Sequence, residues 1–223
     1  MIKATMPRLV TGSLRHRRWP VLLTLITLTL SLTLLLGVQY LRTEVKQTFL
    51  NTISETDLIV GARSGPMNLL LYSVFHIGNA TNNVRWDTYQ HVLDQDSVDW
   101  VVPLSLGDSH KGYRVIATTE AFFERYRFAN RQALSMADGT PFSDVYEAVV
   151  GSEVAAALDY QRGEEIVVAH GTGTTSFTQH ENHPFTITGV LEPTGTPVDR
   201  AVLIPLEGFE AIHIGWKSGM PQP

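Results

Sequence analysis

The sequence of 223 residues contains no cysteine. This absence excludes disulfides, thiolate nucleophiles, and zinc or iron–sulfur centres with cysteine ligands, and it is compatible with an oxidising compartment. An excess of positive charge is also lacking, because the formal net charge is −5. A mildly acidic chain argues against nucleic acid as a partner. Internal repeats and low-complexity tracts are absent too, so the distribution of apolar residues is the most informative feature.

Charged residues are missing from the whole stretch between Arg18 and Arg42. Its roughly 22 residues, Pro20 to Leu41, would reach about 33 Å as a helix, enough to cross a hydrocarbon core of about 30 Å. An aromatic residue stands near each end, where amphipathic rings favour the level of the lipid headgroups. We therefore predict a membrane-spanning helix over 19–41, whose anchor residues are Trp19, Pro20, Leu22, Leu25, Leu28, Leu32, Leu35 and Tyr40.

Two other interpretations of this apolar stretch stay open. It could be a buried helix of a soluble protein, although such helices seldom run this long without a charge. It could also be a cleaved signal peptide, although the apolar region of a signal peptide is normally shorter.

The charges beside the predicted span favour one orientation in the membrane. Residues 1–18 carry five basic residues and no acidic residue, whereas Arg42, Glu44 and Lys46 beyond the span are close to balanced. The positive-inside rule then places residues 1–18 in the cytoplasm, as a short basic tail, and the chain from about residue 42 outside.

The helix is expected to continue beyond the membrane as an extension over residues 42–56. Leu41, Val45, Phe49 and Ile53 recur every four residues and form an apolar stripe that needs a partner to cover it. A second apolar run, Met67 to Ile77, is too short to span a bilayer as a helix and is expected to form a core or interface helix. The predicted functional surface consists of that stripe and part of this run, namely Leu41, Val45, Phe49, Ile53, Leu69, Leu70 and Phe75.

Residues 57–223 have the pattern of one α+β domain, with five to seven short strands interrupted by helices. Strands are predicted over Leu58–Val60, Val98–Leu104, Tyr113–Thr118, Glu147–Val150, Glu165–His170, Phe185–Leu191 and Val202–Ile204. Helices are expected between them, including one that starts after Gly151 and one that Pro205 opens.

The only concentration of potential metal ligands is His170, His180 and His183, with Glu181 beside them. Three imidazoles and a carboxylate could bind zinc. However, His180 and His183 lack the helical spacing of a zincin, and solvated histidines at a hairpin tip explain the pattern more simply. No other constellation indicates catalysis, so we predict no catalytic residue, no metal site and no cofactor.

Several stretches together resemble the N-terminal part of an ABC-transporter permease of the MacB/FtsX/LolE type. They are DLIVGARSG after the helix, VVGSEVAAAL, RGEEIVVAHG, and HPFTITGVLEPTGTPVDRAVLIPLEGFEAIH. In terms of that family, Gly151–Leu158 is similar to the helix after the incoming strand and Phe185–Leu191 to the strand that returns toward the membrane. Thr194–Arg200 is similar to the linker into the last strand.

The resemblance implies one N-terminal transmembrane helix followed by a mixed α/β periplasmic core domain. It also implies a location in the bacterial inner membrane, a lipid environment, a partner ABC ATPase subunit and a second permease subunit, identical or different. The chain itself would be non-catalytic, because ATP hydrolysis would reside in the partner. Its role would be to pass motion to the periplasmic domain for export, lipoprotein release or signalling.

One departure from that family leaves alternatives open. Related permeases have four spans, whereas this sequence ends at Pro223 with no second apolar run, so it is either a fragment or a single-span relative. An anchored periplasmic binding or sensor domain without an ATPase is the first alternative. An anchored zinc-dependent enzyme that uses the three histidines is the second.

Overall fold

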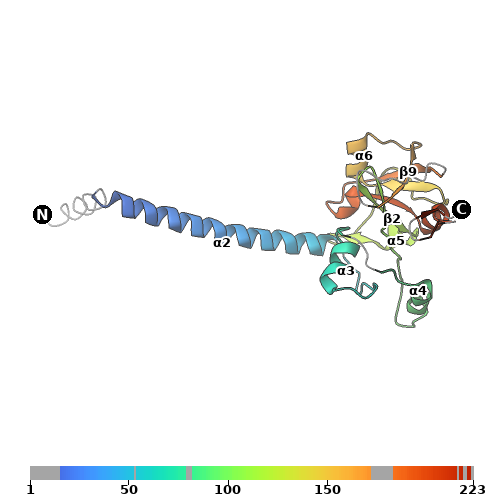
Figure 1. The fold of residues 1–223 in the computed structure, drawn as a ribbon, viewed down its shortest axis with the longest axis horizontal. Helices are drawn as coiled ribbons and strands as arrows, with labels where there is room; N and C mark the ends of the chain where they lie inside the picture. Colours follow the sequence, from blue (N-terminus) through green and yellow to red (C-terminus); the bar gives the residue numbers. More distant parts are fainter. Residues whose placement is uncertain are drawn as a thin grey trace. The chain divides into compact units, whose positions relative to one another are not determined.

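The computed structural model describes residues 16–52, 54–78, 82–171, 183–214, 216–217 and 220–221. The chain divides into two compact units, Met1–Phe49 and Leu50–Pro223. We call the second the sheet unit, because it contains the β-sheet (Figure 1).

Helix α2 (Arg18–Thr52) contains the predicted span. Its segment Arg18–Glu44 is long and apolar enough to cross a membrane, by length and composition. Four threonine hydroxyls return to helix carbonyls: Thr24 donates to Pro20, Thr27 to Thr24, Thr33 to Thr29 and Thr43 to Gln39. These internal bonds satisfy polar side chains that would otherwise be costly in lipid.

An eight-stranded mixed sheet organises the second unit, in the order β5-β9-β6-β10-β2-β1-β8, with β7 also paired to β9. The pairs β2–β10 and β6–β9 are parallel. The strands are β1 (Asp108–His110), β2 (Tyr113–Thr118), β5 (Met136–Gly139), β6 (Glu147–Val150), β7 (Glu165–Ile166), β8 (Ala169–His170), β9 (Phe185–Leu191) and β10 (Ala201–Pro205).

Both faces of the sheet are covered, which explains why β10 is buried at all five positions. Because side chains alternate along a strand, Val202 and Ile204 join one core cluster while Ala201 and Leu203 join the other. Helices α6 (Ser152–Leu158) and α7 (Leu206–Ile212) cover the first cluster. Helix α5 (Ala121–Arg125) and the short helix η2 (Pro197–Arg200) cover the second.

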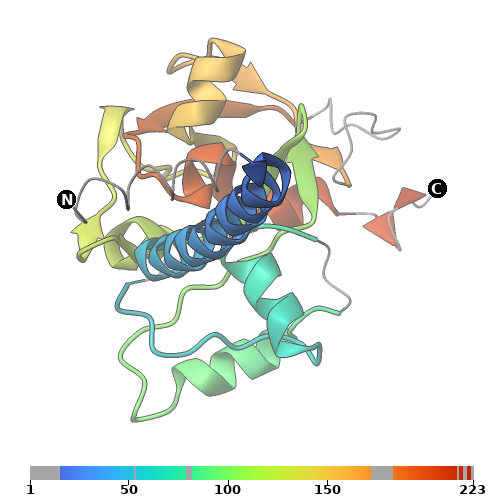
Figure 2. The same ribbon diagram turned by 90° about the vertical axis from the view of Figure 1, so that its left-hand side faces the viewer.

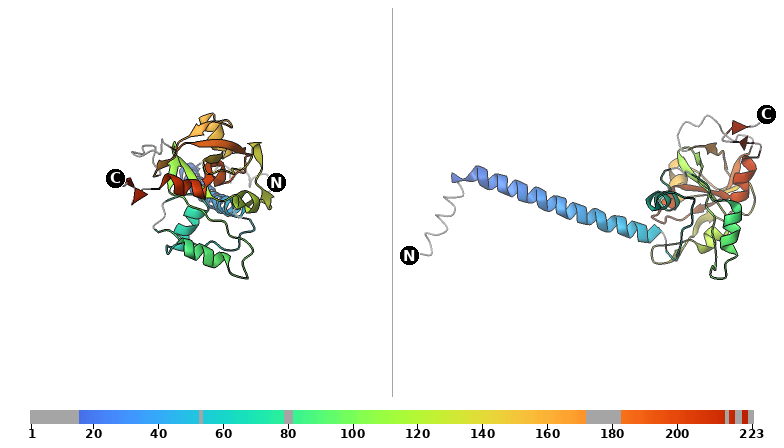
Figure 3. Two further views of the ribbon diagram at one scale, coloured as in Figure 1. Left: turned by 90° about the vertical axis from the view of Figure 1, so that its right-hand side faces the viewer. Right: turned by 60° about the horizontal axis from the view of Figure 1, so that its bottom comes forward.

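Helices α3 (Pro66–Ser73) and α4 (Trp86–Leu93) lie on the side of the sheet unit opposite α6 (Figures 1 and 2). Two small strand pairs complete the described chain. They are β3 (Arg127–Phe128) with β4 (Gln132–Ala133), and β11 (Trp216–Lys217) with β12 (Met220–Pro221), the latter beside the main sheet (Figure 3).

The predicted α+β class is confirmed, but three strand predictions were wrong. Leu58–Val60 and Val98–Leu104 form no strand, and Leu58 is 75% exposed. An apolar run becomes a strand only where a neighbouring strand can pair with it, and none does so here. The predicted strand Glu165–His170 is divided between β7 and β8, which pair with different partners.

Candidate coupling site

Helix α2 ends inside the sheet unit at Thr52, a residue that is only 2% exposed. The hydroxyl of Tyr126 donates a hydrogen bond to the Thr52 carbonyl oxygen at 2.7 Å. Two residues later, the Ser54 backbone N–H donates to the Arg127 carbonyl at 3.0 Å. The last carbonyls of a helix have no partner within the helix. Tyr126 and Arg127 therefore fix the end of α2 to the segment that follows α5.

Tyr126 is itself held rigidly. It follows α5 directly, and its ring stacks on Phe122 with the ring centroids 4.9 Å apart. Burial raises the pKa of Tyr126 to about 12. The hydroxyl therefore stays protonated at physiological pH and can donate to Thr52. Its oxygen also lies 3.4 Å from Thr196 Oγ1, in the loop before β10.

The Thr194–Asp199 loop is built around a buried carboxylate. Asp199 is 4% exposed, and its oxygens accept hydrogen bonds from Thr194 N at 2.8 Å, Thr194 Oγ1 at 2.8 Å and Gly195 N at 2.7 Å. Since the Thr194 hydroxyl proton goes to Asp199, the Thr196 hydroxyl must donate in the 2.7 Å contact between the two threonines. Thr196 Oγ1 then accepts from Val198 N and caps η2. A directed chain of hydrogen bonds holds the loop.

The exit of α3 reaches the same loop. The pKa of His76 is lowered to about 4, chiefly by burial, and its ring hydrogen-bonds the backbone of Pro197. Proline has no N–H, so the neutral imidazole donates to the Pro197 carbonyl. Arg114 of β2 donates to the carbonyl oxygens of His76 and Gly78 and holds this turn against the sheet.

Gly151 brings α6 against the loop from the other side. A Cβ atom at this position would overlap the carbonyl oxygens of Val198 and Asp199. Only glycine allows this approach, and Gly151 N also donates to Ala201 O at 2.9 Å. The Thr194–Asp199 loop therefore meets Tyr126, His76 and the start of α6.

The predicted anchor residues all lie on α2 and are exposed, and the leucines and aromatic residues among them range from 49% for Leu22 to 71% for Trp19. No part of the apolar window is buried within the described residues. A helix that is apolar on all sides and has no protein cover is typical of one that faces lipid. The assignment of individual anchor residues stays a prediction.

The structure describes only some of the residues of the predicted functional surface. Leu41 is 62% exposed, whereas Leu69, Leu70 and Phe75 are half-buried on α3 and its exit. The side chains of Val45 and Phe49, and the whole of Ile53, lie outside the described part of the chain. The role of this surface stays a prediction.

The histidine cluster is described only at one residue. His183 is exposed and its ring stacks on Tyr146, with the ring centroids 5.6 Å apart. The His170 backbone lies in β8, but its side chain and all of His180 and Glu181 lie outside the described residues. Among the side chains that the structure does describe, no group of three could hold a metal ion.

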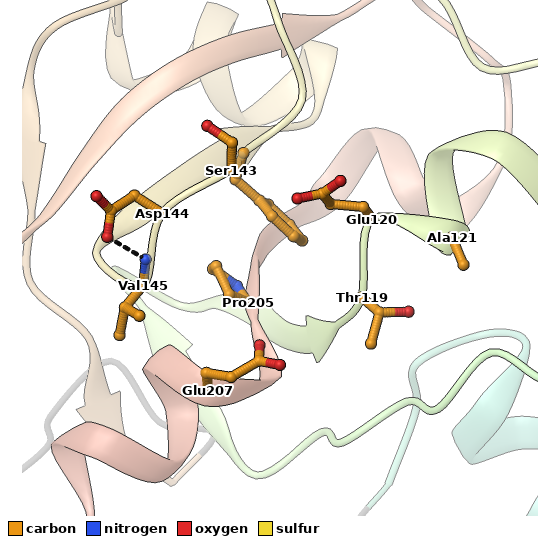
Figure 4. A pocket seen from close by; sticks show the side chains of 9 residues that line it. Thr119, Glu120, Ala121, Ser143, Asp144, Val145, Pro205 and Glu207 are labelled. Carbon is orange, nitrogen blue, oxygen red and sulfur yellow. Dashed lines mark hydrogen bonds between the residues drawn. The ribbon is translucent and has the colours of Figure 1, made fainter.

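A cavity of about 370 Å³ opens beside the start of α5 and α7. Figure 4 shows Glu120, Asp144 and Glu207 around it, on three different segments. Asp144 Oδ1 accepts from Val145 N at 2.6 Å, and all three carboxylates are on exposed residues. The hydroxyl of Ser143, which also lines the cavity, donates to Glu147 at 3.3 Å, and no hydrogen bond described in this structure joins a hydroxyl to one of the three carboxylates.

Sequence reasoning missed Tyr126, His76 and Asp199 as parts of one site. The Gly195–Pro197 turn marks a loop, and the resemblance indicated a linker at Thr194–Arg200. The contact between Tyr126 and Thr52 joins residues 74 positions apart. Neither hydrophobic period nor turn chemistry carries such a signal.

A model of the MacB-like periplasmic core domain family matches residues 21–219. The chain belongs to this family. The match confirms the resemblance to permeases of the MacB/FtsX type, and with it an apolar N-terminal helix followed by a MacB-like mixed α/β domain. The family is that of the periplasmic domains of ABC-type transporter permeases.

Two solved structures are similar to this MacB-like chain. One is the periplasmic region of MacB from Actinobacillus actinomycetemcomitans, with 15% identity, a TM-score of 0.40, and coverage of 66% of this chain and 64% of that one. The other is the extracellular domain of the noncanonic ABC-type transporter YknZ from Gram-positive bacteria. It has 13% identity and a TM-score of 0.39, and the match covers 60% of this chain and 67% of that one. No curated protein matches the sequence.

Proposed function

We propose that this MacB-like chain is part of the permease subunit of an ABC transporter. In this proposal α2 crosses the inner membrane, and the sheet unit receives motion that ATP hydrolysis in a separate subunit produces. The observation that carries the proposal is the family match over residues 21–219, which includes both the apolar helix and the sheet unit. The output would be export, lipoprotein release or transmembrane signalling.

The hydrogen bonds at the end of α2 support a mechanical role. A lever transmits motion only if its end is fixed to what it moves, and Thr52 is bonded to Tyr126 inside the sheet unit. The apolar stripe from Leu41 to Ile53, together with Leu69, Leu70 and Phe75, would then contact the second permease subunit. Buried polar bonds of this kind are directional and favour one geometry.

The orientation can be tested with single cysteines, because the natural chain has none. We expect Ser143→Cys, on an exposed residue of the sheet unit, to react with a membrane-impermeant maleimide in spheroplasts. Ser13→Cys in the basic tail should react only after the membrane is permeabilised. The reverse pattern would place the sheet unit in the cytoplasm and contradict the proposal.

The partner can be tested by purification of the tagged chain from its native membranes in mild detergent. We expect an ATPase subunit with a Walker A motif and a second permease subunit to co-purify, with ATP hydrolysis in the eluate. Purification without a nucleotide-binding protein would favour the anchored binding or sensor domain.

A further inference from the structure

The end of the membrane helix and the exit of α3 are far apart in sequence, yet both reach one short loop. The Tyr126 hydroxyl donates chiefly to Thr52 O at 2.7 Å, and Thr196 Oγ1, at 3.4 Å, is the weaker second acceptor of the same proton. His76, whose carbonyl oxygen accepts from Arg114 Nε at 3.2 Å, also hydrogen-bonds the backbone of Pro197, the next residue of the loop. The two attachments therefore meet at neighbouring residues.

The loop between these attachments is stiff. Asp199 receives three short hydrogen bonds from Thr194 and Gly195 within an environment that excludes water. Gly151 packs against the carbonyl oxygens of Val198 and Asp199 with no room for a Cβ atom. A loop held on both sides moves as one body rather than bending at each residue.

By contrast, α3 is held loosely. None of its residues is buried. Its described connections to the rest of the sheet unit are concentrated at its end, where Tyr72 donates to Leu106 O and Val74 is buried. His76 and Arg114 follow directly. A displacement of the loop at Pro197 therefore acts on α3 close to the contacts described at its exit.

We infer that the Thr194–Asp199 loop is a coupling joint, which passes a displacement of the last turn of α2 to the exit of α3. This inference rests on the proposed function, because it supplies the route by which motion of the membrane helix would reach the surface of α3. Tyr126 connects the loop to the end of α2, His76 connects it to the exit of α3, and Asp199 keeps the loop rigid between these contacts.

Hydrogen exchange at single amides of the full chain in lipid nanodiscs tests the joint. Ser54 N reports the end of α2, Thr194 N and Gly195 N report the loop, and Ile77 N, bonded to Leu71 O at 2.9 Å, reports the exit of α3. The variant Tyr126→Phe removes only the hydroxyl. The matched control is Tyr160→Phe, which removes a hydroxyl bonded to His110 Nε2 at 2.7 Å, away from the loop.

In Tyr126→Phe we expect the exchange rate to rise about fivefold at all three reporter sites. This factor corresponds to the loss of one hydrogen bond of about 1 kcal/mol. Adding His76→Leu, which removes the donor to Pro197, should then raise exchange at Ile77 by much less than His76→Leu does alone. The control Tyr160→Phe should leave the three sites unchanged. If Tyr126→Phe folds poorly, Thr196→Val replaces it: because the Tyr126–Thr52 bond stays in place, exchange should rise in the loop and at Ile77 but not at Ser54.

Two results would overturn the joint. One is a rise confined to Ser54 with no change in the loop or at Ile77. The other is full additivity of Tyr126→Phe and His76→Leu at Ile77, which would make the two contacts independent anchors. Neither result depends on an ATPase, so failure of the joint and failure of the transporter proposal are distinguishable.

Discussion

The sheet and the segment of residues 57–104 differ sharply in how they are stabilised. Strand β10 is buried along its full length, whereas neither α3 nor α4 has a buried residue. The difference extends to polar groups. Asp199 is 4% exposed and bonded by three donors, while the Arg85–Asp87 ion pair is exposed at both side chains.

This comparison assigns different mechanical properties to the two regions. Local stability follows buried apolar area and protected hydrogen bonds, so the sheet should behave as one rigid body. The 57–104 segment exposes Leu58, Met67, Ile77 and Trp86. Such a surface can change its contacts without loss of a core of its own.

The largest expected effect is in the core. Phe185 of β9 is fully buried in the core cluster that α6 and α7 cover, so Phe185→Ala should lower the free energy of unfolding by about 3–5 kcal/mol. Trp86→Ala removes an even larger side chain that is 57% exposed, and it should change that free energy by less than about 0.5 kcal/mol. Urea denaturation of the full chain in detergent measures both. Equal losses would contradict the contrast.

Gly151 and Gly65 differ in the space that a Cβ atom would find at each position. Gly151→Ala places a methyl group against Val198 O and Asp199 O, so we expect a loss of about 2–3 kcal/mol from overpacking. Gly65→Ala, at the start of α3, meets open space and should be neutral. Thermal unfolding compares the two variants. A stable Gly151→Ala protein would show that the loop can move away from α6 at little cost.

Two aspartates sharpen the comparison of polar groups. Asp199→Asn replaces an acceptor-only group by an amide beside three donors, so it should cost about 2 kcal/mol. Asp94→Asn, on an exposed residue after α4, should be within about 0.5 kcal/mol of the natural chain. Chemical denaturation is the measurement. An unchanged Asp199→Asn protein would mean that the carboxylate does not hold the loop.

The smallest effect is on pH dependence. The pKa of His76 is about 4 when folded, below the ordinary value of 6.5, so the unfolded chain binds more protons between these pH values. The contribution of His76 to the free energy of unfolding is therefore fully present above pH 6.5 and is lost as the pH falls toward 4. At pH 5.5 the loss is about 1 kcal/mol.

His76→Gln keeps a donor for Pro197 and removes this titration. The pKa of Asp108 is raised to about 6, mainly by burial, and contributes in the opposite direction, but it is common to both proteins. The free energy of unfolding of the natural chain, taken relative to that of the variant, should therefore fall by about 1 kcal/mol from pH 7 to pH 5.5. A constant difference would show that His76 is not buried as a neutral ring.

The parts that could be predicted from the sequence are those with a strong local pattern. Apolar and polar residues alternate in Phe185–Leu191, which forms β9, and the charge-free run between Arg18 and Arg42 forms most of α2. Leu58–Val60 looks equally apolar but has no strand to pair with, and pairing is a tertiary property. The same reason hid the coupling site, because Tyr126 and Thr52 meet only after the sheet has formed.

The most direct test of the account is hydrogen exchange on the complex purified from native membranes, with and without ATP. We expect ATP to change the exchange of Thr194 N, Gly195 N and Ile77 N together, while the amides of β10 stay protected. If ATP changes none of the three, or if the loop and α3 respond separately, the sheet unit does not receive motion through this loop.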